Sequence, residues 1–392
     1  MQLPFINDLE DVALALPVAL RVNAHAHFSG RGVTIAILDS GFYPHPDLTQ
    51  PVNRIVHHVD ARFDPPRSGT GLGKPRAMSW HGTMVAGVCA GSGLRSMYRY
   101  ASLAPKARLV LVSTGKPHSR HISEDDIARA LRWVLRHARR FNIRVVNLSI
   151  GGDIPSDGQL TPLDALVEEA VNAGMVVVCA IGNDGARKVV PPASAPSAIT
   201  VGGLDDQNSL DRTRWRMYRS NYGLGALGSP KPEVIAPAAW IAAPMIPNTP
   251  THRAAQLWWH VEHATDEELA RLLRTREARR LIPPEQRQAP AHWLRRLARQ
   301  RINEQKFIHP HYQHVDGTSF AAAIVSSVVA QMLEANPALT PSEVKQLIVQ
   351  TARPLPNVPA ERQGAGVIDA GAAVAAAMAA RPLAQPASAS LP

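Results

Sequence analysis

The fold is decided by one stretch, Gly32-Val-Thr-Ile-Ala-Ile-Leu-Asp39-Ser-Gly41. Its run of apolar residues after a glycine is typical of a strand that is buried on both faces of a parallel sheet. The run ends in a carboxylate and a glycine turn. Asp39 should therefore lie at the carboxyl edge of the sheet, where α/β proteins place their functional groups.

Strands of the same kind alternate with helices along the chain. A serine followed by three carboxylates at 123–126 is typical of a helix start, and it opens a helical pattern over 127–140. A second helical pattern runs over 161–174 and ends in a glycine. This alternation predicts an α/β fold, with a parallel, mostly doubly wound sheet and helices on both faces. The other apolar runs lie at 107–112, 144–149, 175–180, 198–201 and 233–235.

Residues 247–314 interrupt this alternation. They contain 12 Lys or Arg and seven acids, so their balance of +5 is half of the chain's net charge of +10. Amphipathic patterns at 266–273 and 291–298 predict a basic helical insert. The predicted divisions are an N-terminal segment (1–30), a discontinuous core domain (31–246 and 315–380), the helical insert (247–314) and a disordered tail (381–392).

The composition is that of a globular chain. Of 392 residues, 45% are hydrophobic and 19% are charged, which excludes a chain that is disordered or fibrous throughout. No run of 18 or more apolar residues occurs, so no membrane span is expected. The start carries Asp8, Glu10 and Asp11 and makes a poor secretory signal. We therefore expect a cytoplasmic protein in which Cys89 and Cys179, both in apolar surroundings, are buried and reduced.

Three polar residues occur in the order Asp39, His81, Ser319. Ser319 opens a long apolar helix, where the first backbone N–H groups lack helical partners. A serine hydroxyl is a weak nucleophile until an imidazole takes its proton, and a carboxylate fixes the tautomer of that imidazole. The three residues therefore predict acyl transfer. Their order excludes the α/β-hydrolase arrangement, in which the acid and then the histidine follow the serine.

With these motifs and a fourth, Ala180-Ile-Gly-Asn183, the sequence resembles the subtilisin-like serine proteases, or subtilases. The resemblance implies a serine endopeptidase that hydrolyses peptide bonds through an acyl-enzyme intermediate, without a cofactor. Ser319 would be the nucleophile, and His81 would be the base and then the acid. Asp39 would orient His81, and the Asn183 side chain would donate to the oxyanion. The residues implied to bind the peptide substrate are Ser149, Ile150, Gly151, Ala180 and Gly182.

The resemblance covers about 20–246 and 315–378, with departures. Ala323 stands where the family usually has a proline, and the insert comes directly before the nucleophile. We also expect the family's inhibitory propeptide to be missing, because only about 30 residues precede the first predicted strand. We therefore expect 247–314 to control activity, either by docking an acidic regulatory protein or by capping the cleft. The apolar positions expected to hold the insert against the body or the partner are Leu269, Leu272, Leu273, Trp293, Leu294 and Leu297.

Other interpretations stay open at this point. A catalytically silent scaffold would carry the same motifs. The basic insert could also bind nucleic acid, since clustered arginines neutralise phosphates, although no recognised reader motif is present. Asp47 lies in a segment that resembles the family's calcium-binding one, but Arg95 in the complementary loop opposes a cation. His260 and His263, three residues apart, leave a zinc hypothesis together with a second group in a predicted loop, His309, His311 and His314.

Overall fold

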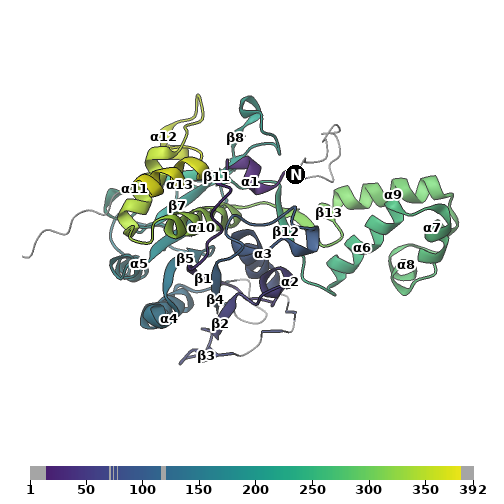
Figure 1. The fold of residues 1–392 in the computed structure, drawn as a ribbon, viewed down its shortest axis with the longest axis horizontal. Coiled ribbons are helices and arrows are strands. Elements are labelled where there is room, and N and C mark those ends of the chain that lie inside the picture. The colour runs from purple at the N-terminus through teal and green to yellow at the C-terminus, as the bar shows by residue number, and fades with distance from the viewer. Residues whose placement is uncertain (1–14, 70–71, 74, 77, 116–120, 381–392) are drawn as a thin grey trace, which may run out of the picture.

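The computed structural model describes residues 15–380 except 70–71, 74, 77 and 116–120. The tail predicted to be disordered, 381–392, lies outside the described residues, as does the predicted N-terminal segment up to residue 14. The described chain forms a layered core from which one helical projection extends (Figure 1).

Nine strands form the central sheet. They are β1 (Thr34–Asp39), β2 (Ile55–Asp60), β3 (Arg67–Ser68), β4 (Arg108–Ser113), β5 (Ile143–Leu148), β6 (Val176–Ala180), β7 (Ile199–Asp205), β8 (Arg216–Met217) and β11 (Val234–Pro237). The order is β11-β7-β6-β5-β1-β4-β2-β3, and β8 also pairs with β7. The pairs are parallel except those made by β3 and β8, which are short and antiparallel.

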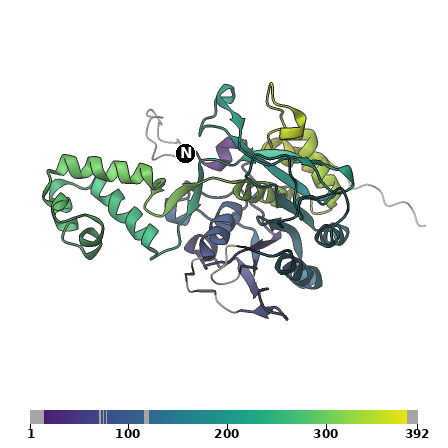
Figure 2. The ribbon, with the colours of Figure 1, turned by 180° about the vertical axis from the view of Figure 1, so that it is seen from behind.

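Helices cover both faces of this sheet (Figures 1 and 2). Successive side chains of a strand point to opposite faces. Along β1, Ile35 and Ile37 join one core cluster and Ala36 and Leu38 join another. The first cluster is covered by α3 (Ser79–Ala90), α10 (Thr318–Ala335), α11 (Pro341–Thr351) and α13 (Ala370–Ala379), and the second by α4 (Glu124–Phe141) and α5 (Pro162–Asn172). The predicted α/β fold with a doubly wound, mostly parallel sheet is confirmed.

The local signals in the sequence place two of these helices. Ser123 caps α4 by accepting a hydrogen bond from the Asp126 N–H, and three carboxylates occupy the first turn of the helix. Thr161 and Asp164 form a capping box at the start of α5. Both helices therefore begin at the residues that the sequence predicts.

Helix α10 is the core helix of the molecule. By length and composition it is apolar enough to cross a membrane, but 83% of that stretch is buried inside the protein. It packs against α3 and α13 and against β5, β6, β7 and β11. Its apolar character is therefore explained by burial in the core. Cys89 and Cys179 are buried as free thiols, and burial raises the pKa of Cys89 to about 12.

The insert contains more helices than the sequence predicts, and it is not helical throughout. The two predicted patterns form α7 (Asp266–Leu272) and α9 (Ala291–Glu304), and two further helices are α6 (Pro250–His263) and α8 (Arg276–Leu281). Residues 307–315 form a hairpin instead, with strands β13 (Phe307–His309) and β14 (Tyr312–Val315). Strand β14 pairs with β12 (Ile241–Pro244), which makes a small antiparallel sheet at the base of the insert.

The apolar residues of the insert pack its helices against one another. Helix α6 packs against α7, α8 and α9, and Leu269 and Leu294 are buried in this packing. Leu272, Leu273 and Leu297 are partly buried there, while Trp293 is 38% exposed. These positions pack the helices of the insert against one another, and they belong to one apolar cluster that continues into the body. Their contact with a partner stays a prediction.

The remaining elements are short. They are α1 (Val18–Arg21), α2 (Pro46–Thr49), α12 (Ala360–Gln363), β9 (Gly223–Leu224) and β10 (Pro230–Lys231), with 3-10 turns at Leu94–Ser96, Arg212–Arg214, Ala226–Gly228 and Gln286–Gln288.

Candidate active site

Asp39 is the last residue of β1 and is fully buried at the carboxyl edge of the sheet. Its carboxylate accepts hydrogen bonds from the Ser40 N–H at 2.7 Å and the Ser40 hydroxyl at 3.0 Å. It also lies 2.8 and 2.9 Å from Nδ1 of His81. Because a buried polar group must be hydrogen-bonded, these partners fix the orientation of the Asp39 carboxylate.

Gly82 allows His81 to reach this carboxylate. His81 lies in the first turn of α3, which packs on β1. A Cβ at position 82 would lie 2.4 Å from the carbonyl oxygen of Gly41 and 3.0 Å from Cβ of Asp39. Only a glycine permits this close approach of the helix to the turn after β1. The sequence His81-Gly82 is therefore a packing requirement as well as a chemical one.

The contact with Asp39 sets the protonation of His81. Burial by itself lowers the pKa of His81, but the charge and the hydrogen bond of Asp39 outweigh it, so the pKa is raised above its ordinary value of 6.5. The contact with Nδ1 directs a proton to that nitrogen, so Nε2 of the neutral ring is unprotonated. The side chain is still 24% exposed. Its free nitrogen can therefore act as a base toward a bound molecule.

Ser319 is the second residue of α10, and only 9% of it is exposed. Its hydroxyl donates to the Ser149 carbonyl at 3.3 Å, and within the described chain it makes no hydrogen bond to His81. The two are nevertheless neighbours, since the His81 ring lies 5.8 Å from the ring of Phe320, centroid to centroid, and α3 packs against α10. The structure therefore brings Asp39 and His81 into direct contact and places Ser319 beside them in a resting hydrogen bond.

Asn183 is oriented by Thr318. Its side-chain oxygen accepts from the Thr318 N–H at 2.9 Å and from the Thr318 hydroxyl at 3.1 Å. The Thr318 hydroxyl in turn accepts from the Gly182 N–H at 3.2 Å. The Asn183 amide nitrogen has no partner among the described residues, so it is free to donate. Thr318 was not among the predicted site residues, although its position directly before Ser319 was the available signal.

The residues implied to bind the substrate lie at one edge of the sheet. Strand β5 is followed by Ser149, Ile150 and Gly151. Its parallel neighbour β6 ends at Ala180, and Gly182 lies two residues further on. Gly182 has a φ of 106°, and a Cβ there would lie 2.6 Å from the Asn221 amide nitrogen. Parallel strands bring their carboxyl ends to the same edge. These segments therefore flank the turn that carries Ser319.

The chain belongs to the subtilase family, whose sequence model matches residues 30–366. Among characterised proteins, it is 28% identical over 353 residues to the serine protease AprX of Bacillus subtilis, covering 87% of this chain and 66% of that protein. It is 34% identical over 198 residues to subtilisin Savinase of Lederbergia lenta, covering 50% of this chain and 62% of that protein. The chain thus spans two thirds or less of the length of these curated relatives.

Solved structures share the fold. Fervidolysin from Fervidobacterium pennivorans, a keratinolytic enzyme related to subtilisin, superposes with a TM-score of 0.62 at 20% identity, over 98% of this chain and 49% of that one. A mutant form of the protease domain of PatA gives a TM-score of 0.58 at 20% identity, over 92% of this chain and 100% of that one. The predicted family and fold are confirmed.

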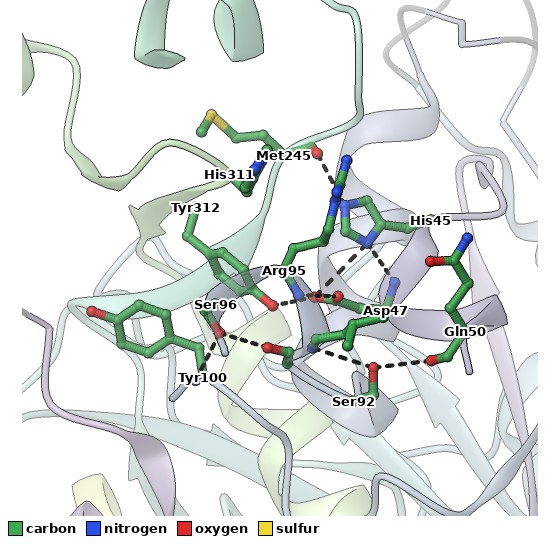
Figure 3. Close-up of polar contacts among 12 residues, drawn as sticks. His45, Asp47, Gln50, Ser92, Arg95, Ser96, Tyr100, Met245, His311 and Tyr312 are labelled. Carbon is green, nitrogen blue, oxygen red and sulfur yellow. Dashed lines mark hydrogen bonds and ion pairs between the residues drawn. The ribbon is translucent and has the colours of Figure 1, made fainter. Parts of the chain in front are cut away.

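The residues around Asp47 do not fit a calcium ion (Figure 3). One carboxylate oxygen accepts from the Arg95 N–H at 3.0 Å, and the other is bound by the Tyr312 hydroxyl. The Asp47 carbonyl is taken by the guanidinium of Arg54. Calcium needs six to eight free oxygen ligands, and donors already occupy these three. Tyr312 belongs to β14, so a residue of the insert binds the Asp47 carboxylate where a cation would otherwise bind.

The zinc hypothesis finds no support in the geometry. Nδ1 of His260 lies 2.6 Å from the Gln256 carbonyl, and Nδ1 of His263 lies 2.8 Å from the Trp259 carbonyl. Each ring is therefore bound to its own helix. No group of three or more His, Cys, Asp or Glu side chains in the described part of the chain is arranged to hold a metal ion.

Three histidines form the junction between the insert and the body, and we call them the junction histidines: His252, His309 and His311. Nδ1 of His252 accepts from the Asn248 N–H at 3.2 Å, so the proton of this ring is on Nε2, which donates to Nδ1 of His311 at 2.8 Å. Nδ1 of His309 accepts from the His311 N–H at 3.3 Å. Each basic nitrogen therefore already accepts a hydrogen bond, and protonating it would break that bond.

The surroundings of the junction histidines also oppose a positive charge. Burial is the main cause that lowers the pKa of each to about 4, and the charge of Arg95 adds to it at His252 and His311. The remaining neighbouring groups are His45, Arg99 and Arg253, which lower these pKa values, and Asp47, which raises those of His309 and His311.

We predict that the protein loses stability as the pH falls from about 6.5 to about 4. The pKa values of the junction histidines are lower in the folded chain than in the unfolded chain. The unfolded chain therefore takes up protons first, which favours unfolding over this pH range. Urea unfolding midpoints at pH 7.5 and pH 5 measure the effect.

The variant His252→Gln/His311→Asn keeps an amide hydrogen bond at the junction without a titrating group, so its midpoint should fall less between the two pH values. The control His260→Gln removes an exposed histidine from the same helix. Its unfolding midpoint should fall as much as that of the wild type. An equal fall in all three proteins would contradict the assignment.

Proposed function

We propose that this chain is a serine endopeptidase that hydrolyses peptide bonds through an acyl-enzyme intermediate. The observation that carries the proposal is the buried contact between Asp39 and Nδ1 of His81, which leaves Nε2 free beside the turn of Ser319. Membership of the subtilase family and the similarity to proteases support the same activity.

The first half of the reaction follows from this arrangement. As Ser319 Oγ attacks the peptide carbonyl carbon, its proton passes to Nε2 of His81, and Asp39 stabilises the imidazolium. The oxyanion that forms accepts hydrogen bonds from the Asn183 amide and the Ser319 N–H. The C–N bond then breaks, Nε2 returns its proton to the leaving amine, and the acyl group remains on Ser319 as an ester.

Water completes the cycle by the same path. His81 takes a proton from the water as the water attacks the ester, and returns that proton to Ser319 Oγ when the acid leaves. The extended substrate would pair with the backbone of 149–151. Gly151, Ala180 and Gly182 would form the walls of the first specificity pocket, where close packing on Asn221 leaves no room for a side chain at Gly182.

A catalytically silent scaffold is the second candidate function. It is favoured by one observation, the hydrogen bond that the Ser319 hydroxyl makes to the Ser149 carbonyl instead of to His81. A rotation about the Cα–Cβ bond of Ser319 would release its hydroxyl from this hydrogen bond. Reactivity of Ser319 toward a fluorophosphonate therefore discriminates between the two candidates.

We predict that a fluorophosphonate labels Ser319 in the wild type, and that Ser319→Ala abolishes both labelling and peptide hydrolysis. Asn183→Ala should lower kcat by about 10²–10³-fold through the loss of one oxyanion donor, with KM little changed. Peptide mapping of the adduct and steady-state kinetics measure these effects. A wild type that is folded but neither labelled nor active would establish the silent scaffold.

We also predict the direction of the pH dependence. Only neutral His81 can accept the proton, and Asp39 raises the pKa of this histidine above its ordinary value of 6.5. The kcat/KM should therefore fall as the pH decreases through a value above 6.5. The measurement is kcat/KM against pH over the range in which urea unfolding shows the protein to be folded. An acid limb that lies below 6.5 would contradict the assignment of His81 as the base.

We propose that the insert docks an acidic protein partner, which would control the peptidase. Several of its acids are already paired with arginines, as in Asp266 with Arg295 and Glu262 with Arg299. A group of arginines at its far end is exposed, and within the described chain no acid pairs with them. These residues, the tip arginines, are Arg274, Arg276, Arg279 and Arg280.

The position of the tip arginines favours a partner over a cap on the cleft, because the insert extends away from the core (Figures 1 and 2). We propose a cytoplasmic location, which the two free cysteines support because thiols persist in reducing compartments. We propose that nucleic acid is not the partner, since the insert carries no recognised nucleic-acid-binding motif.

We predict that poly-L-glutamate, used as a probe for an acidic polypeptide, binds the wild type. Salt at about 0.5 M should release it, because salt at this concentration screens the attraction between exposed charges. Reversing the four tip arginines to glutamate should abolish this binding. The control reverses Arg132 and Arg136, which are exposed on α4 of the core, and should keep it. Isothermal titration calorimetry measures the binding of poly-L-glutamate to each variant. Binding of duplex DNA but not poly-L-glutamate would contradict the proposal.

A further inference from the structure

A chain of hydrogen bonds joins the middle of α10 to its first turn through the end of β5. The Ser326 hydroxyl donates to the Asn147 side-chain oxygen at 2.9 Å, and the Asn147 amide donates to Ser149 Oγ at 3.0 Å. The Ser149 hydroxyl then donates to the Ser319 carbonyl at 2.9 Å. Asn147 and Ser326 are fully buried, and the reaction described above uses neither of them.

Each hydrogen bond in this chain fixes the direction of the next. A serine hydroxyl has a single proton, and a carboxamide donates from one end and accepts at the other. Because Ser326 gives its proton to the oxygen of Asn147, the amide nitrogen must face Ser149. Because Ser149 Oγ accepts that N–H, its own proton is directed to the Ser319 carbonyl.

The last hydrogen bond of this series, from the Ser149 hydroxyl to the Ser319 carbonyl, is kept during the proposed reaction. Ser149 and Ser319 exchange two hydrogen bonds, one from Ser149 Oγ to the Ser319 carbonyl and one from Ser319 Oγ to the Ser149 carbonyl. The second must break when Ser319 gives its proton to His81. During the attack, the bond that Ser149 Oγ donates therefore remains as the direct link between the nucleophile and the strand end that holds the substrate.

We propose that Asn147 and Ser326 are positioning residues that set the direction of this chain and thereby hold Ser319 in register with the substrate. The inference rests on the proposed function. Without the Ser326 hydroxyl, the Asn147 amide is free to turn over and present its oxygen to Ser149. The Ser149 proton then goes to Asn147, and the Ser319 carbonyl loses its link to the substrate-binding strand end.

The test compares two neighbouring serines on α10. Ser326→Ala removes the first donor in this series of hydrogen bonds. Ser327→Ala is the matched control, because Ser327 is equally buried and its hydroxyl donates to the Ala323 and Ile324 carbonyls of its own helix. We expect Ser326→Ala to lower kcat about fivefold, the effect of one net hydrogen bond, with KM unchanged. Ser327→Ala should leave kcat unchanged.

A double-mutant cycle separates positioning from a general loss of stability. If Ser326 acts through Ser149, then Ser326→Ala has no further effect on kcat in a Ser149→Ala background, because the final donor is already missing. A merely structural role would lower kcat by the same factor in both backgrounds. An equal kcat for Ser326→Ala and Ser327→Ala would also overturn the proposal.

A crystal structure of Ser326→Ala tests the positioning independently of activity. We expect the distance from Ser149 Oγ to the Ser319 carbonyl to exceed 3.5 Å, roughly the limit of a hydrogen bond, where the wild type has 2.9 Å. A retained bond overturns the positioning role. A wild type that no fluorophosphonate labels overturns the proposed function instead, so the two failures are distinguishable.

Discussion

The packing of the first turn of α10 against the ends of β5 and β6 is the constraint on which the rest of the site depends. Thr318 bonds to Asn183 and to Gly182, and Ser319 bonds to Ser149. The rest of α10 is buried in the core, so it cannot shift without losing apolar contacts along its length. The hydrophobic core therefore holds the proposed nucleophile, and the polar contacts of the turn only set its orientation.

A second and separate contact places the proposed base. Helix α3 approaches the turn after β1 closely enough for His81 to reach Asp39, which the absence of a side chain at Gly82 permits. The two contacts meet where α3 packs on α10. The proposed base and the proposed nucleophile are therefore held by separate contacts, and the Ser319 hydroxyl rests on the Ser149 carbonyl beside His81.

The insert is part of this framework through its hairpin. Strand β14 leads directly to Asp316, whose carboxylate accepts from the Trp240 N–H at 3.0 Å and pairs with Lys306 at 2.7 Å. Tyr312 of the same strand bonds to Asp47 in the body. The base of the insert is therefore continuous with the turn of the nucleophile, while its helices extend from the body.

The sequence by itself determined six strands of the central sheet, the capped helices, the order of Asp39, His81 and Ser319, and the family, because apolar periodicity and capping are set by neighbours along the chain. Strand β2 of the same sheet was not predicted. The sequence did not determine that Thr318 orients Asn183, that the Tyr312 hydroxyl binds the Asp47 carboxylate, or that Ser326 reaches Asn147. These partners are 135, 265 and 179 residues apart. Only the tertiary structure decides such contacts, because they depend on which helix faces and strand ends are buried together.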